Sequence, residues 1–525
     1  MKRSVSALTL LFTSVSAILG SGWLFASYYA AGIAGPASIL SWLIAGVCII
    51  FVAFVFAELS TMLPVMGTST RVPHMTHGTL IGFMYAWIIW LCCASIPPAE
   101  VQAIIQYVSF YYPFLTKVHG GGLTPDGYAC AAVLMLIIAS LNAFSLRWLL
   151  RCNTALTFMK IVIPLIMIIT VLIYFFHPHQ IIHPDHSSFL PLGIKGVLTA
   201  ISAGGMVYAF NGFTQASEWG GAVKKPGISL PFAIIGSIAL TLIIYLGLEV
   251  AFLASMQPDN LLHGWDHLTL THENSPLAAI VYQDGFTWLL PILFVGAIIG
   301  PFAAGLIYSS GAAQSLRSKS INGYLPKFLQ VLTPGHSPIL AILVNFIFGM
   351  LLFAPLPGWN KMMGFLTSLM TFTYTIGPIC LLALRDQAPN QNRPFRLPFA
   401  TIWATLAFYL CTVFSYFNGW EIISKLSIGF IAGFIILIAY RVFSKNPNKP
   451  ALSWLSSIWI WPYIGGLTLI SYLGSFGGGK NILPFGWDLV VLAFFSIFIV
   501  YLARRFKLPA EQTQRYIEEL KLEKI

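Results

Sequence analysis

Apolar residues occur along this chain in long runs that short polar segments separate. A helix of about 20 apolar residues spans a bilayer, and on that rule the chain contains about fourteen spanning segments. Their approximate ranges are 5–33, 36–63, 79–111, 125–145, 149–176, 195–219, 229–256, 287–315, 337–355, 362–384, 399–417, 421–443, 455–474 and 485–503. The pattern predicts an all-α integral membrane protein that crosses the bilayer many times.

Two of the apolar runs are interrupted near their middle, one in each half of the chain. The first break is Gly20-Ser21-Gly22, inside the run from Val5 to Ala34. The second lies in the run from Ile194 to Trp219, where Gly204-Gly205 is followed by Ala209-Phe210-Asn211-Gly212. Unwound backbone survives at membrane depth only where it lines a cavity or is buried in protein. Interrupted helices at matching places in two halves indicate the central binding site of a secondary transporter.

The charged residues are few and unevenly distributed. Charged residues make up 9% of the chain and hydrophobic residues 57%, whereas a soluble domain carries about 25% charged residues. The net charge of +11 does not indicate a nucleic-acid partner, because most lysines and arginines fall in alternate connections. The opposite connections hold only Lys117, Lys195, Lys361, Lys425 and Lys480. This bias predicts a multi-pass protein of the cell inner (cytoplasmic) membrane with cytoplasmic N- and C-termini.

Cysteine and histidine usage gives little indication of a bound metal. The seven cysteines lie in or beside apolar runs and form no CxxC motif, so we expect no cofactor and no resident metal. The outer connection 177–194 leaves one alternative open. It contains His177, His179, His183 and His186. Their spacing could bind a metal, but Pro178 and Pro184 favour an exposed histidine-rich loop.

The two breaks together have the chemistry of a receptor for a zwitterion. A break at Gly20-Ser21-Gly22 exposes the N-terminus of a half-helix, whose free N–H groups and positive dipole end suit a carboxylate. Carbonyl groups freed at the two breaks can hold an ammonium group, so an α-amino acid is the expected ligand. The residues expected at this site are Ala17, Ile18, Gly20, Ser21, Gly22, Tyr208, Ala209, Phe210, Asn211 and Gly212. The alternative is a close-packed Gly-x-Gly contact between helices.

Glu100 and Lys160 are ionisable residues far inside apolar runs. Burial disfavours the charged form of a carboxyl, so Glu100 could take up a proton near neutral pH, and Pro97-Pro98 should kink its helix toward the site. A lysine near the middle of a bilayer costs about 2.5–3.5 kcal/mol, so Lys160 should face other helices. A structural hydrogen bond for Glu100 and a snorkelling side chain for Lys160 are the alternatives.

Other polar residues inside the runs have less specific expectations. Glu58, Glu218 and Glu249 are expected to pair with basic residues of the connections. Three residues of the run 362–384 could face the site, although membrane packing explains most aromatic residues of such a chain. They are Thr371, Tyr374 and Thr375.

Several motifs taken together resemble the amino acid–polyamine–organocation (APC) transporters. Gly20-Ser21-Gly22 is similar to the GSG of the family's first helix, and Tyr208 to Phe213 to the break of its sixth. Further matches are Val223-Lys224-Lys225-Pro226, Asn322-Gly323-Tyr324-Leu325-Pro326 and Arg393-Pro394-Phe395-Arg396-Leu397-Pro398. A narrower resemblance is to the bacterial aspartate:proton symporters of this family. It rests on Gly22-Trp23-Leu24-Phe25, Ala200-Ile201-Ser202-Ala203-Gly204-Gly205 and the stretch from Ser471 to Gly478.

The resemblance implies a leucine-transporter-type fold of two inverted five-helix repeats with the first and sixth helices discontinuous. Residues 1–176 and 195–386 would form the repeats, 399–503 accessory helices and 504–525 a solvated cytoplasmic tail. Lys160 would stand where other members bind a coupling sodium ion and would bond carbonyls of the first helix, and its protonation could couple to transport, as could that of Glu100. Tyr208 would be an aromatic gate over the substrate, with a core aromatic as the alternative. Ala222 and Gln314 depart from the Glu and Arg of many members, both toward the cytoplasmic side.

The sequence therefore predicts a transporter of an α-amino acid that works by proton symport and alternating access. Its partners would be a small amino acid, protons and the lipid bilayer. An amino acid exchanger and a transporter-like amino acid sensor stay open as alternatives. A membrane-embedded enzyme is disfavoured because the chain has neither an HExxH nor a GxSxG motif. The amino acid, whether acidic, neutral or cationic, and the oligomeric state stay open.

Overall fold

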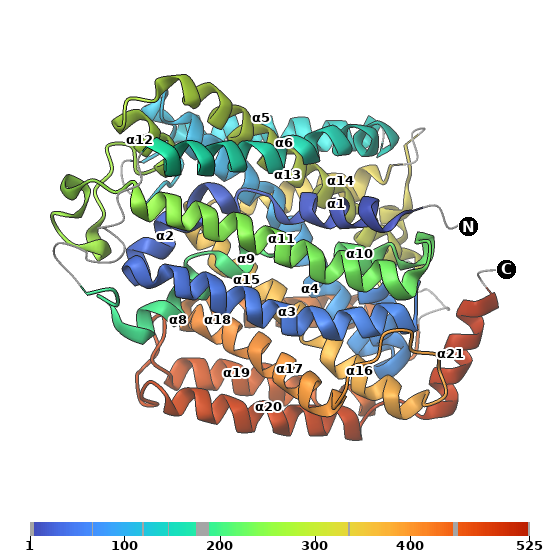
Figure 1. The fold of residues 1–525 in the computed structure, drawn as a ribbon. Coiled ribbons are helices and arrows are strands. Elements are labelled where there is room, and N and C mark those ends of the chain that lie inside the picture. The colour runs from blue at the N-terminus through green and yellow to red at the C-terminus, as the bar shows by residue number, and fades with distance from the viewer. Residues whose placement is uncertain are drawn as a thin grey trace.

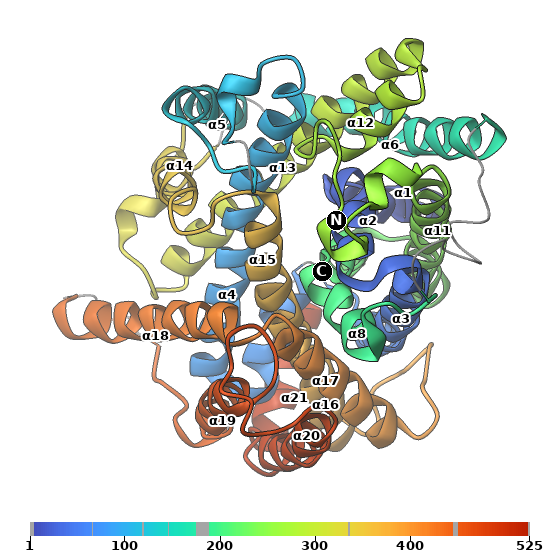
Figure 2. The ribbon, with the colours of Figure 1, turned by 90° about the vertical axis from the view of Figure 1, so that its left-hand side faces the viewer.

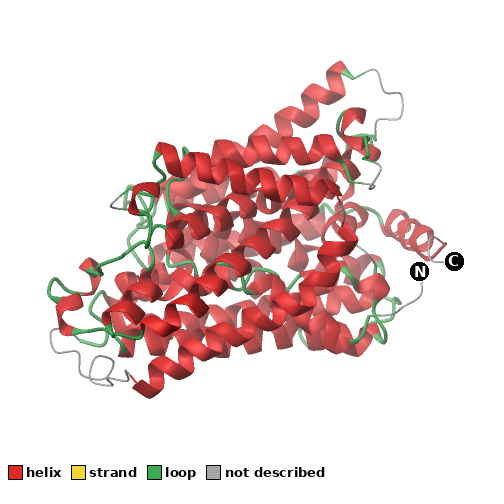
Figure 3. Cartoon of the chain, turned by 90° about the horizontal axis from the view of Figure 1, so that it is seen from above, coloured by secondary structure: helices red, strands yellow, loops and turns green. Residues whose placement is uncertain are grey.

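The computed structural model describes residues 5–65, 67–117, 120–144, 146–174, 188–333, 337–444 and 450–522. Within these ranges the chain forms helices and loops and no β-strand, as Figure 3 shows. The helices are α1 Ala7–Ile18, α2 Gly22–Ala34, α3 Ser38–Met62, α4 Thr68–Val108, α5 Pro125–Phe144, α6 Leu146–Tyr174, α8 Gly193–Ala203, α9 Met206–Ala209, α10 Gln215–Glu218, α11 Pro226–Ala254, α12 Pro276–Gln283, α13 Leu290–Ile321, α14 Ile339–Leu352, α15 Trp359–Tyr374, α16 Ile376–Gln387, α17 Ala400–Phe417, α18 Trp420–Phe443, α19 Ile460–Leu473, α20 Trp487–Arg505 and α21 Ala510–Leu522.

The described part of the chain has the helices of a multi-pass membrane protein. Ten helical segments in it are long and apolar enough to cross a membrane, and α1 and α14 are shorter apolar helices. The all-α membrane class expected from the sequence is confirmed. The count of about fourteen spans stays a prediction, because the runs at 195–219 and 455–474 form only short helices.

The helices pack in one bundle with α4 near its middle. Figure 2 shows α4 and α15 at the centre, with α1, α2, α3 and α11 on one side and α18, α19 and α20 at another edge. Helix α4 packs along α13 and α15, while α1 packs against α11 and α6. The start of α1 and the helix α21 lie at the same end of the bundle, as Figure 1 shows. The glycines at positions 20, 22, 204 and 205, where the two apolar runs are interrupted, are buried inside this bundle.

Both interruptions expected from the sequence are present. Helix α1 ends at Ile18 and α2 begins at Gly22. The second run forms α8 and the single-turn helices α9 and α10, with turns between them. Gly205, between α8 and α9, has a left-handed φ of 83°. Glycine adopts this conformation without steric cost, so Gly205 ends α8 and redirects the chain.

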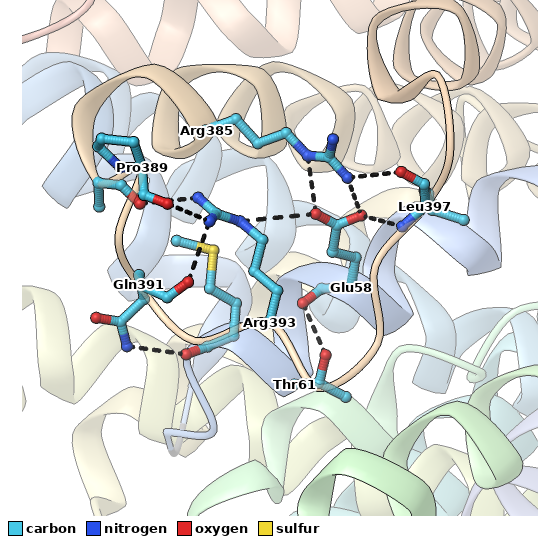
Figure 4. Close-up of polar contacts among 9 residues, drawn as sticks. Glu58, Thr61, Arg385, Pro389, Gln391, Arg393 and Leu397 are labelled. Atoms are coloured by element: carbon cyan, nitrogen blue, oxygen red, sulfur yellow. Dashed lines mark hydrogen bonds and ion pairs between the residues drawn. The ribbon is translucent and has the colours of Figure 1, made fainter.

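A buried carboxylate joins α3, α16 and the connection that follows α16 (Figure 4). Glu58 of α3 accepts hydrogen bonds from Nε and Nη2 of Arg385 at 2.9 and 2.7 Å, and from the N–H of Leu397 at 2.7 Å. The guanidinium of Arg393 lies 3.9 Å from the same carboxylate. Glu58 is fully buried, and a two-pronged Arg–carboxylate pair is the strongest common form of this interaction. The expected pairing of Glu58 with basic residues is confirmed.

The C-terminal tail is helical, and it has one exposed face, as the sequence suggested, and one face that packs on α4. Helix α4 loses helical geometry at Gly78, where φ is 82° and ψ is −170°. The carbonyls of Met75 and Thr76, just before this kink, accept hydrogen bonds from Thr513 Oγ1 at 3.0 Å and from the N–H of Leu508 at 2.9 Å. Thr513 is fully buried. The tail therefore satisfies backbone groups that the kink leaves free.

Replacing Glu58 by alanine should destabilise the folded protein. The change leaves the Arg385 guanidinium and the Leu397 N–H without their acceptor, and removing one partner of a buried pair costs about 3–5 kcal/mol. Arg385 keeps 21% of its side chain exposed, so we expect the lower end of this range. A thermal-unfolding midpoint in detergent measures the effect. Asp386→Ala is the matched control, because it removes the pair with Arg504, whose side chain is 43% exposed, and such pairs contribute only about 0–1 kcal/mol. Equal midpoints for the two variants would contradict the role of Glu58.

Candidate functional site

The two interruptions face each other at contact distance. A Cβ atom built on Gly22 would lie 3.0 Å from the Cβ of Ala209, and one built on Gly212 would lie 2.7 Å from the carbonyl carbon of Ala17. Gly212 also has a φ of 117°, which side chains rarely allow. Glycine at these positions thus lets the unwound segments of the two runs touch. The residues expected to form one site from two distant segments do lie together.

Glu100 reaches from α4 to the first interruption. Its Oε1 accepts the backbone N–H of Ser21 at 3.3 Å and the hydroxyl of Tyr208 at 2.7 Å. A Cβ on Gly20 would lie 2.6 Å from the same oxygen, so glycine leaves room for this approach. The other oxygen, Oε2, is buried and has no hydrogen-bond partner among the described residues. A carboxyl group of the protein thus sits where α2 begins, at the positive end of that helix.

Lys160 reaches from α6 to the end of α1. Its Nζ donates to the carbonyl oxygen of Ser16 at 3.0 Å, and its side chain is buried. The N–H of Gly20 turns to Ile18 at 2.9 Å, so it does not continue the helical pattern to the carbonyl of Ser16. The ammonium group therefore donates to a carbonyl at the negative end of the α1 dipole. The snorkelling alternative does not apply to this buried side chain.

Tyr245 of α11 bridges the two interruptions, and the sequence analysis did not single it out. Its hydroxyl lies 2.8 Å from the carbonyl oxygen of Ala209 and 3.3 Å from that of Ile18. Its ring stacks on Trp42 with centroids 4.8 Å apart, and Phe210 packs edge-on against it at 5.5 Å. The side chain of Phe210 is therefore part of this aromatic core. The sequence does not indicate the bridging role of Tyr245, because Tyr245 is one of many tyrosines in apolar runs.

The two other glutamates inside the apolar runs, the buried Glu249 and the half-buried Glu218, accept hydrogen bonds from neutral donors. Glu249 of α11 accepts hydrogen bonds from the hydroxyl of Ser38 and from Trp42 Nε1, the latter at 2.9 Å. Glu218 accepts the backbone N–H of Ser69 at 3.1 Å. The expectation of a basic partner is wrong for Glu249, because a serine hydroxyl and an indole N–H satisfy its carboxyl without a second charge.

Asn211 and the residues expected from the run 362–384 are only partly brought together. The hydroxyl of Tyr374 donates to Oδ1 of Asn211 at 3.1 Å, and Asn211 keeps partial exposure. Thr371 and Thr375 instead bond side chains of α17 and α4. Of the three, Tyr374 alone is joined to the second interruption by these contacts.

Trp359 covers the interruptions from the side opposite the chain termini. It is the first residue of α15 and is fully buried. Its indole Nε1 donates to Ser21 Oγ at 2.9 Å, and its backbone N–H donates to Gln106 Oε1 at 2.8 Å. Sequence reasoning missed it because a tryptophan near the end of an apolar run is typical of a membrane-interface anchor.

No group of three or more histidine, cysteine, aspartate or glutamate side chains in the described part of the chain is placed to hold a metal ion. His177, His179, His183 and His186 lie outside the described residues, so the metal alternative for that segment is not addressed by this finding.

Comparison with known proteins identifies related transporters along nearly the whole chain. Residues 5–437 match the family model described as amino acid permease. The chain is 31% identical over 504 residues to the glutamate/serine transporter AimA of Bacillus subtilis, covering 95% of this chain and 92% of the relative. It is 30% identical over 512 residues to the aspartate-proton symporter of the same organism, covering 97% of each chain. The branched-chain amino acid permease BcaP of B. subtilis is 24% identical over 464 residues.

Proposed function

Because this chain belongs to the amino acid permease family of the APC superfamily, we propose that it is a secondary active transporter. It moves an α-amino acid across the cytoplasmic membrane by proton symport and alternating access, with both termini in the cytoplasm. The observation that carries the proposal is the carboxyl of Glu100 at the start of α2, bonded to the N–H of Ser21 and the hydroxyl of Tyr208.

The paired interruptions provide opposite charges for the two ends of an amino acid. The N–H groups at the start of α2 suit the substrate carboxylate, and the carbonyls of Ile18 and Ala209 suit its ammonium group. Protein groups already bind at both places, since Glu100 bonds Ser21 and the Tyr245 hydroxyl meets both carbonyls. A bound amino acid replaces these contacts with its own. Its α-carboxylate and α-ammonium groups therefore account for recognition, whatever its side chain.

The same replacement couples the substrate to a proton. If the substrate carboxylate takes the N–H of Ser21, it lies beside Glu100, and two negative charges in one buried site destabilise each other. A proton on Glu100 removes this conflict, and the Oε2 oxygen, which has no hydrogen-bond partner in the described part of the chain, can carry it. Substrate binding and proton binding then favour each other reciprocally. Lys160 holds the end of α1, beside the interruption whose Ser21 N–H binds Glu100.

Residues 1–176 and 195–386 form, in this proposal, the two inverted repeats, each with an interrupted first helix. Residues 399–503 supply accessory helices, and 504–525 a cytoplasmic tail. The support is the position of the interruptions, at the beginning of each half. Tyr208 acts as a gate, since it lies at the second interruption and bonds Glu100.

Aspartate, glutamate and serine are the first substrates to test, because the two relatives at about 30% identity are named for them. A thermal-shift screen of the twenty amino acids should identify the substrate, since a ligand at 100 times its Kd stabilises a protein by about 2.7 kcal/mol. The stabilising amino acid should then be taken up by proteoliposomes and dissipate an imposed pH gradient. Uptake that requires internal amino acid and leaves the gradient intact would indicate an exchanger instead.

Replacing Lys160 by alanine should abolish uptake while leaving the amount of folded protein unchanged. The variant removes the donor to Ser16 at the end of α1, so the interrupted helix loses a charge-assisted contact that holds the site. Radiolabelled uptake, with gel filtration of the same preparation, measures the effect. Lys480→Ala, at an exposed position in an outer connection, is the control and should transport normally. Full uptake by Lys160→Ala would refute the role.

Glu100→Gln should separate substrate movement from proton movement. Glutamine keeps an oxygen for the Tyr208 hydroxyl and the Ser21 N–H but cannot exchange a proton. We expect the variant to retain counterflow of labelled amino acid and to lose substrate-driven acidification of dye-loaded proteoliposomes. Asp488→Asn is the matched control, since Asp488 is also a fully buried carboxyl but lies in α20, bonded to Tyr416 at 2.5 Å. Wild-type proton flux in Glu100→Gln would show that another group carries the proton.

A further inference from the structure

We propose that Trp359 is the outer lid of the site, the side chain that closes it toward the outer solution. Ser21 is the catch, the residue whose hydrogen bond to the indole holds this lid closed. The inference rests on the proposed transport function, because it assigns to one residue the control of access from outside. Trp359 touches neither the carboxyl of Glu100 nor the carbonyls that Tyr245 contacts through any hydrogen bond of the described residues. Its role is therefore in positioning the interrupted helix and in excluding the outer solution.

The position of Trp359 along the bundle follows from its bond to α4. Helix α4 begins at the end of the bundle that holds α21, where Met75 and Thr76 meet the C-terminal segment. Gln106 lies near the opposite end of α4 and accepts the backbone N–H of Trp359. Trp359 thus stands between the site and the end of the bundle away from the chain termini. With cytoplasmic termini, that end is the outer one.

The indole ring fills the space next to the two interruptions, on the side away from the chain termini. It stacks on Phe25 and Tyr29 of α2, with ring centroids 4.8 and 5.6 Å apart and interplanar angles of 22° and 12°. The ring of Tyr208 meets it edge-on at 6.3 Å. A Cβ on Gly205 would lie 2.8 Å from the indole ring, so glycine at this turn leaves room for it. The ring therefore contacts both interrupted segments at once.

Trp359 and Glu100 share the same two neighbours. Ser21 gives its N–H to Glu100 and accepts the indole N–H at its hydroxyl oxygen. Tyr208 gives its hydroxyl to Glu100 and its ring lies against the indole. A substrate carboxylate that displaces Glu100 acts on Ser21 and Tyr208, which are the residues that hold the lid. Binding at the site and release of the lid are thereby linked through direct contacts.

Trp359→Phe tests the catch with little change in shape. Phenylalanine keeps an aromatic ring for Phe25 and Tyr29 but removes the donor to Ser21. We expect amide hydrogen exchange in peptides covering 19–25 and 204–210 to rise about two- to tenfold, as the loss of one neutral hydrogen bond implies. Ser21→Ala should give a similar rise, and the double variant should add little to it, because both changes remove the same bond.

Trp90→Phe is the matched control. Trp90 of α4 is also buried and donates its indole N–H to a side-chain oxygen, Asn345 Oδ1, at 2.9 Å. It should leave exchange at the two interruptions unchanged. Unchanged exchange in Trp359→Phe, or additive effects in the double variant, would overturn the catch even if the protein transports amino acids. If exchange is faster in Trp359→Phe but the wild-type protein transports no amino acid, the catch is supported and the transport function is refuted instead.

Discussion

The structure depends on satisfying the backbone groups that two interrupted helices expose inside a membrane protein. An unpaired N–H or C=O costs several kcal/mol in hydrocarbon, so each must find a partner. Three side chains from three other helices provide them. Glu100 accepts the N–H of Ser21, Lys160 donates to the carbonyl of Ser16, and Tyr245 meets the carbonyls of Ile18 and Ala209. The bundle of α4, α6 and α11 around the interruptions is thus a requirement of hydrogen bonding as well as of packing.

In the proposed function, these partners also prepare the interruptions for substrate recognition. The groups that Glu100 and Tyr245 bind are the ones that an amino acid's own carboxylate and ammonium groups would bind. Replacing an internal hydrogen-bond partner by a group of the ligand costs less free energy than leaving the buried N–H or C=O group with no partner at all. In the proposed mechanism, a proton-binding carboxyl at this position responds to the substrate because the carboxyl and the substrate compete for the same N–H.

Small residues and polar clamps hold the geometry on which this competition depends. Gly20 admits the carboxyl of Glu100, and Gly212 admits the backbone of Ala17. Glu58 binds α3 to α16 and to the following connection. The C-terminal segment closes the kink in α4. The contacts of the C-terminal segment bind α4 directly, and α4 carries both Glu100 and the acceptor for Trp359.

The sequence by itself determined the class of fold and the positions of both interruptions. Long apolar runs can be stable only as membrane helices, and glycines within them mark where winding is lost. It also indicated Glu100 and Lys160, because an ionisable group far inside an apolar run must be buried and must have a function or a partner. It could not assign Tyr245 or Trp359, since aromatic residues abound in such runs for packing alone. Only the tertiary structure joined Ser21 to Glu100, 79 residues away, and to Trp359, 338 residues away. Such partners are set by how helices pack against each other, and no local pattern of residues records that packing.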